Sequence, residues 1–341
     1  MKQHLPCLIS IFILGLFINS NLIYAQKEIA GIEQNQSHKA FIKPPYLKQG
    51  DTVAIVTPAG FLKDSTAVEK GIALMRSWGL EVVIGEHIYD KHNRFAGKDA
   101  DRASDLQWAM DTPSIKAIWC ARGGYGTVRV LDYLDYSNFM KQPKWIIGYS
   151  DITVLHNVMH TKGIETVHGI MASSDSSFEK SHVVSSLYKA LFGKKISYKI
   201  PATVQNRKGS ASGQLVGGNL SLVASLLGTP FDLNTKNKII FLEDIGEYLY
   251  RLDRMLMSLK LNGYFNHCNG LIIGGFNNIP ENEPGFGMSI EEIVNDIVGE
   301  ADFPILFNFP SGHFPENLTL PLGRMVSMKV GKRRSKIVFE K

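Results

Sequence analysis

The sequence predicts a mixed α/β protein with a parallel, flavodoxin/Rossmann-like sheet in its N-terminal domain. From residue 47 onward, apolar runs of strand length alternate with amphipathic stretches of helix length. This alternation is typical of a parallel sheet with helices on both faces. Several runs end abruptly in glycine, proline or a polar residue, as strands do at a sheet edge. The 341 residues, 44% of them hydrophobic, are enough for two domains with cores of their own.

The first 25 residues have the form of a secretory signal peptide. Lys2 gives a positive start, residues 5–18 are almost wholly apolar, and residues 23–25 offer cleavage after Ala25. The apolar run is short for a membrane span, and a retained anchor is the alternative. No second segment is long enough to cross a bilayer. We therefore expect an exported, periplasmic protein whose mature chain begins with a polar tether at residues 26–44.

Charge and cysteine content exclude some functions. Removing residues 1–25 lowers the formal net charge from +5 to +4, because Lys2 leaves and no acid does. The one tight basic run, residues 332–334, falls where a hairpin turn is expected, so we expect no nucleic-acid binding. The mature chain keeps Cys120 and Cys268, each beside an apolar run, which favours two buried free thiols over a disulfide. The sequence has no zinc-ligand spacing.

Residues 45–170 are expected to form the N-terminal domain, residues 171–208 a linker, and residues 209–341 a C-terminal domain. In the first domain we predict strands at 52–57, 80–84, 115–120 and 145–148, and helices at 65–78 (with Ser65 as N-cap), 99–110, 128–134 and 151–160. The linker contains one helix, at 183–192. In the last domain we predict strands at 213–217, 238–242, 270–275 and 304–309, helices at 219–227, 247–261 and 289–298, and a hairpin of 325–330 with 335–339.

Ser150 is the candidate nucleophile. It follows the strand 145–148 and precedes a helix, and a serine on such a turn exposes its hydroxyl near backbone N–H groups that can hold an oxyanion. The match to a nucleophile elbow is incomplete, because Ile152 stands where glycine is common. A simple helix N-cap by Ser150 and Asp151 is the alternative.

The strand 115–120 leads into the segment Arg122-Gly123-Gly124-Tyr125-Gly126. Its glycines allow a tight turn and close approach of the backbone to a ligand. Because the segment lacks the spacing of phosphate-binding loops, we expect it to form a second wall of the Ser150 site and to lend a backbone N–H. Arg122 could bind a substrate carboxylate through its guanidinium fork, or make a structural ion pair instead.

A nucleophilic serine needs a base, and the base needs an orienting acid. His313 lies in a loop rich in glycine and proline after a buried strand, where catalytic side chains are often presented. His168, which follows an apolar segment, is a rival. His156 and His160 lie four residues apart on a helix, but no glutamate follows His156 as in zinc-protease motifs, so we expect no metal site there.

Glu243 is the candidate acid, because it directly follows the apolar run 238–242, where a carboxylate is costly to bury unless paired. Asp244 and Glu247 are expected to cap the next helix. Two alternatives stay open. Glu243 could pair with Arg251 or Arg254, and Glu247 could then be the acid.

Five ordered motifs resemble the serine L,D-carboxypeptidases, also called muramoyltetrapeptide carboxypeptidases, and the related microcin C self-immunity proteins. The motifs are RGGYG at 122–126, GYSDIT at 148–153, GGNL at 217–220, FLED at 241–244 and GH at 312–313. The resemblance covers residues 45–335 and implies a β-rich C-terminal α/β domain, with the active site between the two domains. It implies a triad of Ser150, Glu243 and His313, and an oxyanion hole from the N–H groups of Asp151 and of Gly123 or Gly124.

The resulting hypothesis is a serine peptidase that releases the terminal D-alanine from a wall tetrapeptide. Arg122 and Tyr149 are the expected substrate-binding residues, a muropeptide or peptide is the expected partner, and no metal or other cofactor is expected. A homodimer is left open. The alternatives are a microcin-immunity-type peptidase, a non-catalytic periplasmic muropeptide-binding protein and an ordinary secreted esterase. Export departs from the habit of many family members, which act on recycled wall fragments in the cytoplasm.

Overall fold

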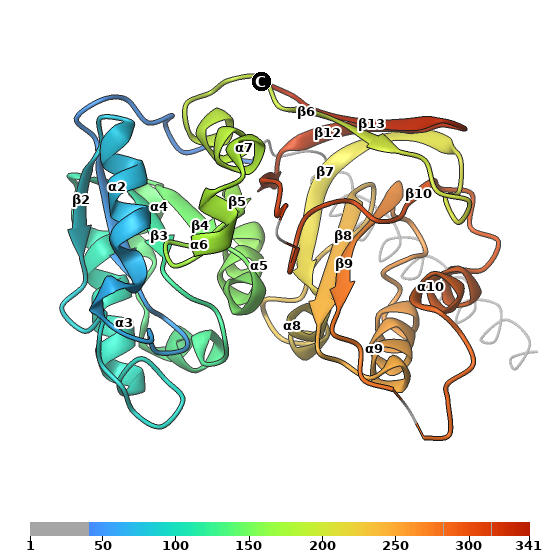
Figure 1. Ribbon diagram of the computed structural model, residues 1–341, viewed down its shortest axis with the longest axis horizontal. Helices are drawn as coiled ribbons and strands as arrows, with labels where there is room; N and C mark the ends of the chain where they lie inside the picture. Colours follow the sequence, from blue (N-terminus) through green and yellow to red (C-terminus); the bar gives the residue numbers. More distant parts are fainter. Residues whose placement is uncertain (1–40, 282, 315) are drawn as a thin grey trace, which may run out of the picture. The chain divides into compact units, whose positions relative to one another are not determined.

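Two β-sheets organise the protein in the computed structural model (Figure 1), which describes residues 41–281, 283–314 and 316–341. The expected signal peptide at 1–25 and most of the expected tether at 26–44 lie outside the described residues. Within the described ranges, no helix is both long enough and apolar enough to cross a membrane.

The first sheet has six strands in the order β11-β5-β4-β3-β1-β2. All neighbours are parallel except β11, which runs antiparallel to β5. The strands are β1 (Thr52–Val56), β2 (Glu81–Ile84), β3 (Ile115–Cys120), β4 (Trp145–Gly148), β5 (Thr166–His168) and β11 (Leu320–Leu322). The helical segments before β6 are η1 (Ser65–Val68), α2 (Glu69–Ser77), α3 (Asp99–Asp111), η2 (Thr127–Tyr133), α4 (Ser137–Lys141), η3 (Ser150–Ile152), α5 (Thr153–Thr161), α6 (Asp175–Phe178) and α7 (Ser181–Leu191).

The second sheet has seven strands in the order β10-β9-β8-β7-β12-β13-β6. Its half from β7 to β10 is parallel, and β12, β13 and β6 pair antiparallel. The strands are β6 (Ser197–Pro201), β7 (Gly209–Asn219), β8 (Ile239–Ile245), β9 (Gly270–Asn277), β10 (Ile305–Leu306), β12 (Met325–Val330) and β13 (Arg334–Phe339). The helices are α8 (Leu220–Ser225), α9 (Leu249–Leu261) and α10 (Ile290–Val298).

The hydrophobic core has three parts, set by the two faces of each sheet. One cluster joins both sheets and includes Trp119 and Phe241, a second lies under α8, α9 and α10, and a third lies under α3, α4 and α5. The mixed α/β fold predicted from the alternation of strands and helices is therefore confirmed. Cys120 and Cys268 are buried and unbonded, as the sequence predicted.

Two sequence expectations differ from the structure because of chain segments that return to a sheet. Within the expected linker 171–208, β6 pairs with β13 at the edge of the second sheet. From the C-terminal part of the chain, β11 crosses back to pair with β5. The expected cap at Ser65 is also wrong. Asp64 caps the helical turn instead, and its carboxylate accepts a hydrogen bond of 2.9 Å from Thr66 N–H.

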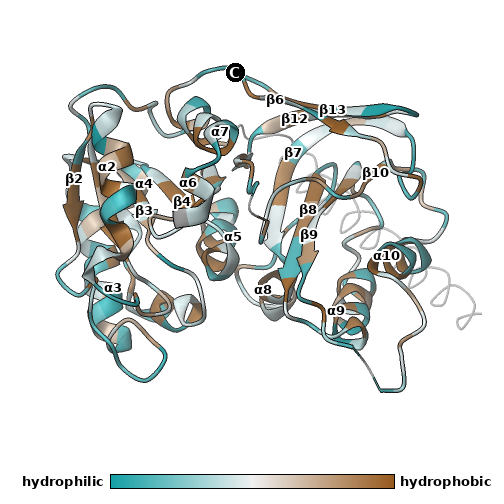
Figure 2. Ribbon diagram, viewed as in Figure 1, coloured by the Kyte–Doolittle hydropathy of each residue, from teal (hydrophilic) through white to brown (hydrophobic). Residues whose placement is uncertain are grey.

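β8 continues past the apolar run and carries two acidic residues inside the strand. Glu243 and Asp244 are both buried, and Figure 2 shows β8 changing from hydrophobic to hydrophilic toward its carboxyl end. Asp244 does not cap α9, contrary to the sequence expectation. Its carboxylate accepts hydrogen bonds from the Asn219 side chain at 3.0 Å and from Ser221 N–H at 2.9 Å, so it caps α8. Pairing of β7 with β8 brings this helix start next to Asp244.

Candidate active site

Ser150 lies on a strained turn between β4 and α5. Its φ is +60°, a left-handed conformation that few residues other than glycine adopt. The preceding Gly148 leaves room for this turn, since a Cβ there would come within 2.8 Å of the Ile152 side chain. A strained serine at the end of a parallel strand is typical of an exposed nucleophile.

A continuous chain of hydrogen bonds joins Glu243, His313 and Ser150. The Nδ1 atom of His313 lies 2.6 Å from Oε2 of Glu243, and its Nε2 atom lies 3.1 Å from Oγ of Ser150. An ionised carboxylate can only accept, so Nδ1–H donates to Glu243, and Nε2 is free to accept the serine proton. The structure thus brings together three residues from β8, the β4–α5 turn and the loop after β10.

The loop that carries His313 is held closely against Glu243. Gly312 has φ of +99°, and a Cβ on it would lie 2.6 Å from Oε2 of Glu243, so only glycine fits. Asn317 accepts from Gly312 N–H at 2.9 Å, and Asn277 donates to the His313 carbonyl at 2.6 Å. Sequence reasoning did not find the two asparagines, because neither has a local pattern that announces such contacts.

The surroundings of His313 control its protonation. Burial alone lowers the pKa of His313, but the hydrogen bond that His313 donates to Glu243 and the charges of Glu243 and Asp244 outweigh it and raise that pKa. The ring of Tyr149 packs edge-on against the ring of His313, with centroids 5.0 Å apart. Burial, with the charge of Glu243, raises the pKa of Tyr149 to about 12, so its phenol stays neutral.

The glycine turn after β3 lies directly beside the serine. A Cβ built on Gly123 would lie 3.2 Å from Oγ of Ser150 and 3.5 Å from the backbone nitrogen of Asp151. Asp151 is in the first helical turn, where N–H groups have no carbonyl partner from an earlier turn. Within the ranges that the structure describes, the N–H groups of Gly123 and Gly124 donate to no protein atom. The space next to Ser150 is therefore bordered by backbone donors.

Arg122 is exposed on the same turn. Its guanidinium donates to the Phe61 carbonyl and lies 5.6 Å from the centre of the Phe61 ring. Among the described residues it forms no ion pair with a carboxylate, so the structural ion pair left open by the sequence is not observed. The Arg122 charge is available to an anionic ligand.

The residues of the rival assignments make other contacts. Arg251 pairs with Glu247 at 3.5 Å on the surface, not with Glu243. The rival base His168 is fully buried between Tyr149 and Phe241, with ring centroids 5.9 Å and 5.0 Å away. Burial holds the pKa of His168 well below its usual value, so it stays neutral and outside the hydrogen-bond chain.

His156 and His160 each contact other groups of the protein. His156 lies 3.0 Å from the Gly148 carbonyl through Nε2, and His160 packs against Phe41 with ring centroids 4.8 Å apart. Burial lowers the pKa of His156 to about 4 and that of His160 to about 3. His156 is buried in the core, and His160 is half-buried.

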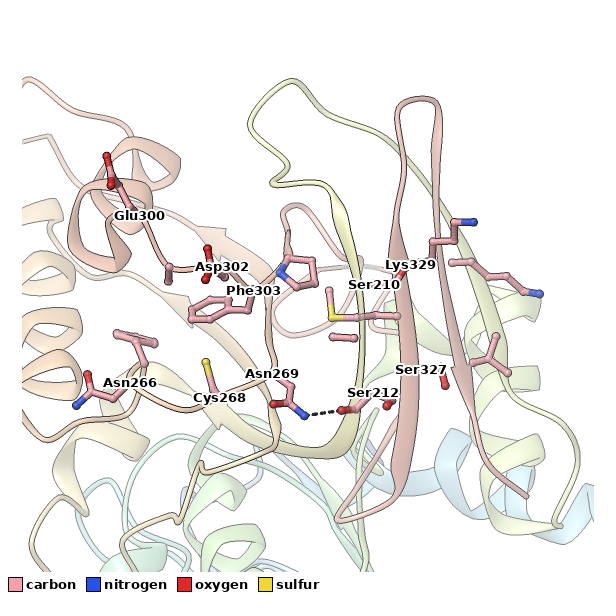
Figure 3. A pocket seen from close by; sticks show the side chains of 17 residues that line it. Ser210, Ser212, Asn266, Cys268, Asn269, Glu300, Asp302, Phe303, Ser327 and Lys329 are labelled. Atoms are coloured by element: carbon pink, nitrogen blue, oxygen red, sulfur yellow. Dashed lines mark hydrogen bonds between the residues drawn. The ribbon is translucent and has the colours of Figure 1, made fainter.

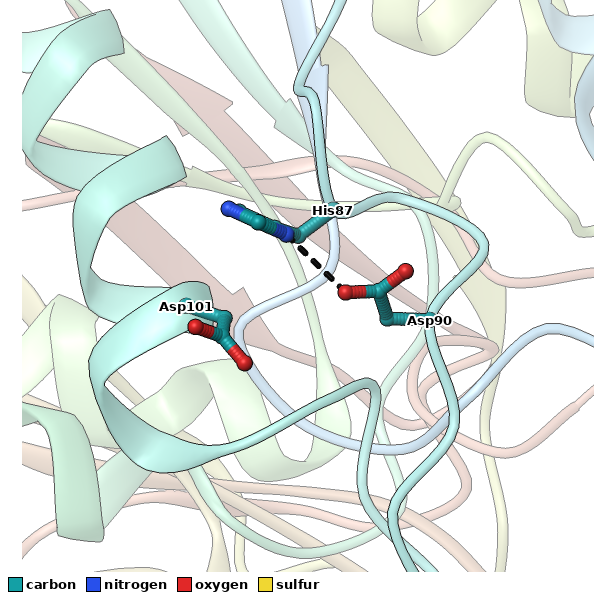
Figure 4. Close-up of side chains that lie close together, drawn as sticks. All are labelled: His87, Asp90 and Asp101. Carbon is teal, nitrogen blue, oxygen red and sulfur yellow. Dashed lines mark hydrogen bonds and ion pairs between the residues drawn. The ribbon is translucent and has the colours of Figure 1, made fainter.

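One group of side chains elsewhere has the composition of a cation site. His87, Asp90 and Asp101 place one ligand atom each within 4.8 Å of one another (Figure 4). His87 Nδ1 already lies 2.9 Å from the Asp90 carboxylate, and Asp101 accepts from Lys98 N–H at the start of α3. The first contact joins two residues of one loop, and the second caps α3, so both have a structural explanation. The three residues are distinct from Glu243, His313 and Ser150.

An open cavity of about 990 Å³ lies on the second sheet, also apart from the serine (Figure 3). Its walls come from β7, β12 and β13 and from the loops around Asn266 and Asp302. No residue of the Glu243–His313–Ser150 chain lines it.

The mixed α/β fold and the acid, base and hydroxyl in one hydrogen-bond chain define the class of serine hydrolases. Comparison with known proteins is more specific. Residues 53–169 match the LD-carboxypeptidase N-terminal domain, and residues 212–328 match the LD-carboxypeptidase C-terminal domain. The chain therefore belongs to the LD-carboxypeptidase family, and it is a hydrolase of the carboxypeptidase type.

Individual relatives agree with this family. The chain is 35% identical over 300 residues to a probable murein peptide carboxypeptidase of Bacillus subtilis, covering 86% of this chain and 94% of the relative. It is 29% identical to a murein tetrapeptide carboxypeptidase of Pseudomonas aeruginosa, covering 83% and 94%. The crystal structure of muramoyltetrapeptide carboxypeptidase from Oxalobacter formigenes is similar, with a TM-score of 0.77, 27% identity and coverage of 85% and 99%.

Proposed function

We propose that this protein is a serine L,D-carboxypeptidase that releases the terminal D-alanine from murein tetrapeptides and leaves the tripeptide. The observation that carries the proposal is the hydrogen-bond chain from Glu243 through His313 to Ser150, beside a turn of free backbone donors. The names of the relatives from Bacillus subtilis and Pseudomonas aeruginosa support the substrate class.

In this mechanism Ser150 is the nucleophile. Its Oγ attacks the carbonyl carbon between the diamino acid and D-alanine, while its proton passes to Nε2 of His313. Glu243 orients His313 and stabilises its charged form. His313 then gives the proton to the leaving amine of D-alanine. A water molecule, deprotonated by His313, next attacks the acyl-serine ester and releases the tripeptide.

We assign the oxyanion hole to the N–H groups of Asp151 and Gly124. The carbonyl of Gly123 accepts a hydrogen bond of 2.9 Å from Gly60 N–H. In a trans peptide the N–H points opposite to the carbonyl. The N–H of Gly124, which shares that peptide unit, therefore points away from Gly60. Donors placed in advance at the developing negative charge are worth about 10²–10³ in rate each.

Substrate selection is assigned to Arg122 and Tyr149. The leaving D-alanine ends in a free carboxylate, and Arg122 carries an exposed guanidinium two residues from the proposed donor Gly124. Such a contact is made only by a terminal residue, which fits exopeptidase action. Tyr149 packs on His313 and forms the adjoining apolar wall.

We also propose that the protein works outside the cytoplasm after removal of residues 1–25. The charged start and the short apolar run of the sequence support this location. The substrate would then be wall peptides in the periplasm and not fragments imported for recycling.

The decisive experiment incubates the purified mature protein with tetrapeptide and pentapeptide muropeptides and analyses the products by mass. We expect the tetrapeptide to lose one alanine residue. The pentapeptide ends in a D,D bond and should stay intact. Ser150→Ala is the control and should reduce turnover by about 10⁴ or more. Unchanged tetrapeptide with the wild-type enzyme, or equal turnover by Ser150→Ala, would contradict the proposal.

A further inference from the structure

The side chain of Asp151 turns away from the serine that precedes it. It is fully buried, and its Oδ2 atom accepts a hydrogen bond of 2.8 Å from Thr127 N–H. Thr127 begins η2, directly after the glycine turn 123–126. The backbone of Asp151 borders the oxyanion space on one side, and the glycine turn 123–126 borders it on the other. The carboxylate of Asp151 therefore also fixes the end of that turn.

Arg102 on α3 also contacts the glycine turn 123–126. Its side chain is wholly buried, and its Nη1 atom donates to the Gly126 carbonyl at 2.9 Å and to the Pro58 carbonyl. Its other terminal nitrogen pairs with Asp99. A buried guanidinium is uncommon and is costly unless its donors are satisfied. Gly126 has φ of +138°, and a Cβ there would lie 2.9 Å from Nη1, so this turn is shaped around the arginine.

The Pro58 contact connects a third loop. Pro58 and Gly60 follow β1, and Gly60 N–H donates to the Gly123 carbonyl at 2.9 Å. Arg102 thus holds the loop after β1 and the turn after β3 with one guanidinium, while Asp151 holds the turn after β3 from the end of β4. Each of these segments follows the carboxyl end of a strand in the first sheet, and Arg102 contacts two of them from the first turns of α3.

We infer that Arg102 and the carboxylate of Asp151 are positioning residues, which together fix the turn at Gly123 and Gly124 in the geometry that stabilises the oxyanion. Neither side chain touches Oγ of Ser150 or His313 in the contacts of the described residues. The inference rests on the proposed function only for the role of Ser150 as nucleophile. It does not depend on which peptide is the substrate.

The physical reason is that a turn rich in glycine has many conformations of similar energy. Oxyanion donors act only when they are held about 2.7–3.1 Å from the developing charge before the reaction begins. The hydrogen bond of Arg102 to Gly126 and that of Asp151 to Thr127, here called clamps, remove that freedom together with the Gly60 contact. Loss of a clamp should therefore lower the rate of acylation without weakening binding of the substrate ground state.

The test compares Arg102→Met, which keeps an unbranched apolar stem but has no donors, with Arg102→Lys and with the control Arg129→Met. Arg129 is exposed and its side chain pairs with the same Asp99 at 2.7 Å, but that side chain touches neither Pro58 nor Gly126. The Arg129 backbone N–H donates to the Gly126 carbonyl at 3.1 Å, and the substitution keeps this bond. The control therefore removes a cation from Asp99 and leaves the clamp in place. Three quantities are measured for each variant: the rate of inactivation by a fluorophosphonate, kcat and KM on the tetrapeptide, and Tm.

We expect Arg102→Met to lower both kcat and the rate of fluorophosphonate inactivation by about 10²–10³, with KM changed less than about threefold. Arg102→Lys keeps a charge and a single donor nitrogen, and both rates should fall about tenfold. Arg129→Met should stay within about twofold in both rates. If Arg102→Met does not fold, the same comparison is made with Arg102→Lys.

A variant of Arg102 with a lower Tm but wild-type kcat and inactivation rate would overturn the inference, because the arginine would then be structural only. Equal losses in Arg129→Met would overturn it as well. A wild-type enzyme that reacts with the fluorophosphonate but leaves tetrapeptide intact would refute the proposed substrate. In that case the fluorophosphonate rates still decide the role of Arg102.

Discussion

Replacing Gly123 by alanine should damage turnover far more than folding. Gly123 does not have a left-handed φ, so alanine is allowed by the backbone. The added Cβ would lie 3.0 Å from Cβ and 3.2 Å from Oγ of Ser150, where carbon atoms prefer about 3.5–4.0 Å. It would also lie 3.5 Å from the Asp151 nitrogen, so it occupies the space intended for the oxyanion.

The magnitude follows from this position. Loss of one oxyanion donor costs about 2.7–4 kcal/mol of transition-state stabilisation, which is about 10²–10³ in kcat. The crowding should cost about 1–3 kcal/mol of folding stability, since the Ser150 side chain can shift by a few tenths of an ångström. KM should change little, because the ground-state carbonyl does not need the hole.

The assay measures release of D-alanine from tetrapeptide and Tm for Gly123→Ala and for the matched control Gly285→Ala. A Cβ on Gly285 meets nothing within 4 Å and its φ is not left-handed, so the control should resemble the wild type. If Gly123→Ala keeps kcat within about threefold of the wild type, the oxyanion space is not where we assign it.

Four further outcomes are expected. Glu243→Gln should lower kcat by about 10⁴, with binding of substrate retained, since the amide no longer holds His313 in the required tautomer; near-normal kinetics would exclude Glu243 as the acid. Burial lowers the pKa of His313, but Glu243 more than compensates, so kcat/KM should fall as the pH drops through a pKa above 6.5. Glu243→Gln should move this acid limb of the pH profile to lower pH. An acid limb that does not move would contradict the coupling of Glu243 to His313. Glu165→Ala leaves the buried Arg324 without its partner at 2.7 Å and should cost about 3–5 kcal/mol of unfolding free energy, measured by denaturant titration, whereas a loss under 1 kcal/mol would argue against this pair. Intact-mass measurement of the periplasmic fraction should find the chain cleaved after Ala25, and a full-length mass in the membrane fraction would show a retained anchor.

Local sequence was sufficient to find the main chemical groups. Ser150 and Glu243 each follow an apolar run, and His313 follows another run in a loop rich in glycine and proline. A strand is recognisable from its own side chains, and in a parallel sheet the residues at strand ends share one edge. The order of five motifs along the chain then supported the resemblance to the serine L,D-carboxypeptidases, which implied that these three residues act together. The 2.6 Å and 3.1 Å contacts of His313 then came from the structure.

Residues that act through distant partners could not be found in this way. Arg102 reads in the sequence as an ordinary charge on an amphipathic helix, yet it is 1% exposed and bonded to carbonyls 44 and 24 residues away. Asp244 was expected to cap the helix that follows it in sequence. It caps α8 instead, because β7 and β8 are neighbours in the sheet.

The sequence by itself therefore determined the alternation of strands and helices, the strand ends that carry Ser150 and Glu243, and the glycine turn at Gly123, because each depends on the properties of neighbouring residues. Only the tertiary structure decided that β11 returns to the first sheet, that His313 meets Ser150, and that a buried arginine supports the turn. The physical reason is that these contacts join residues far apart in the chain. Their formation depends on how two sheets and their shared core pack, which no local pattern encodes.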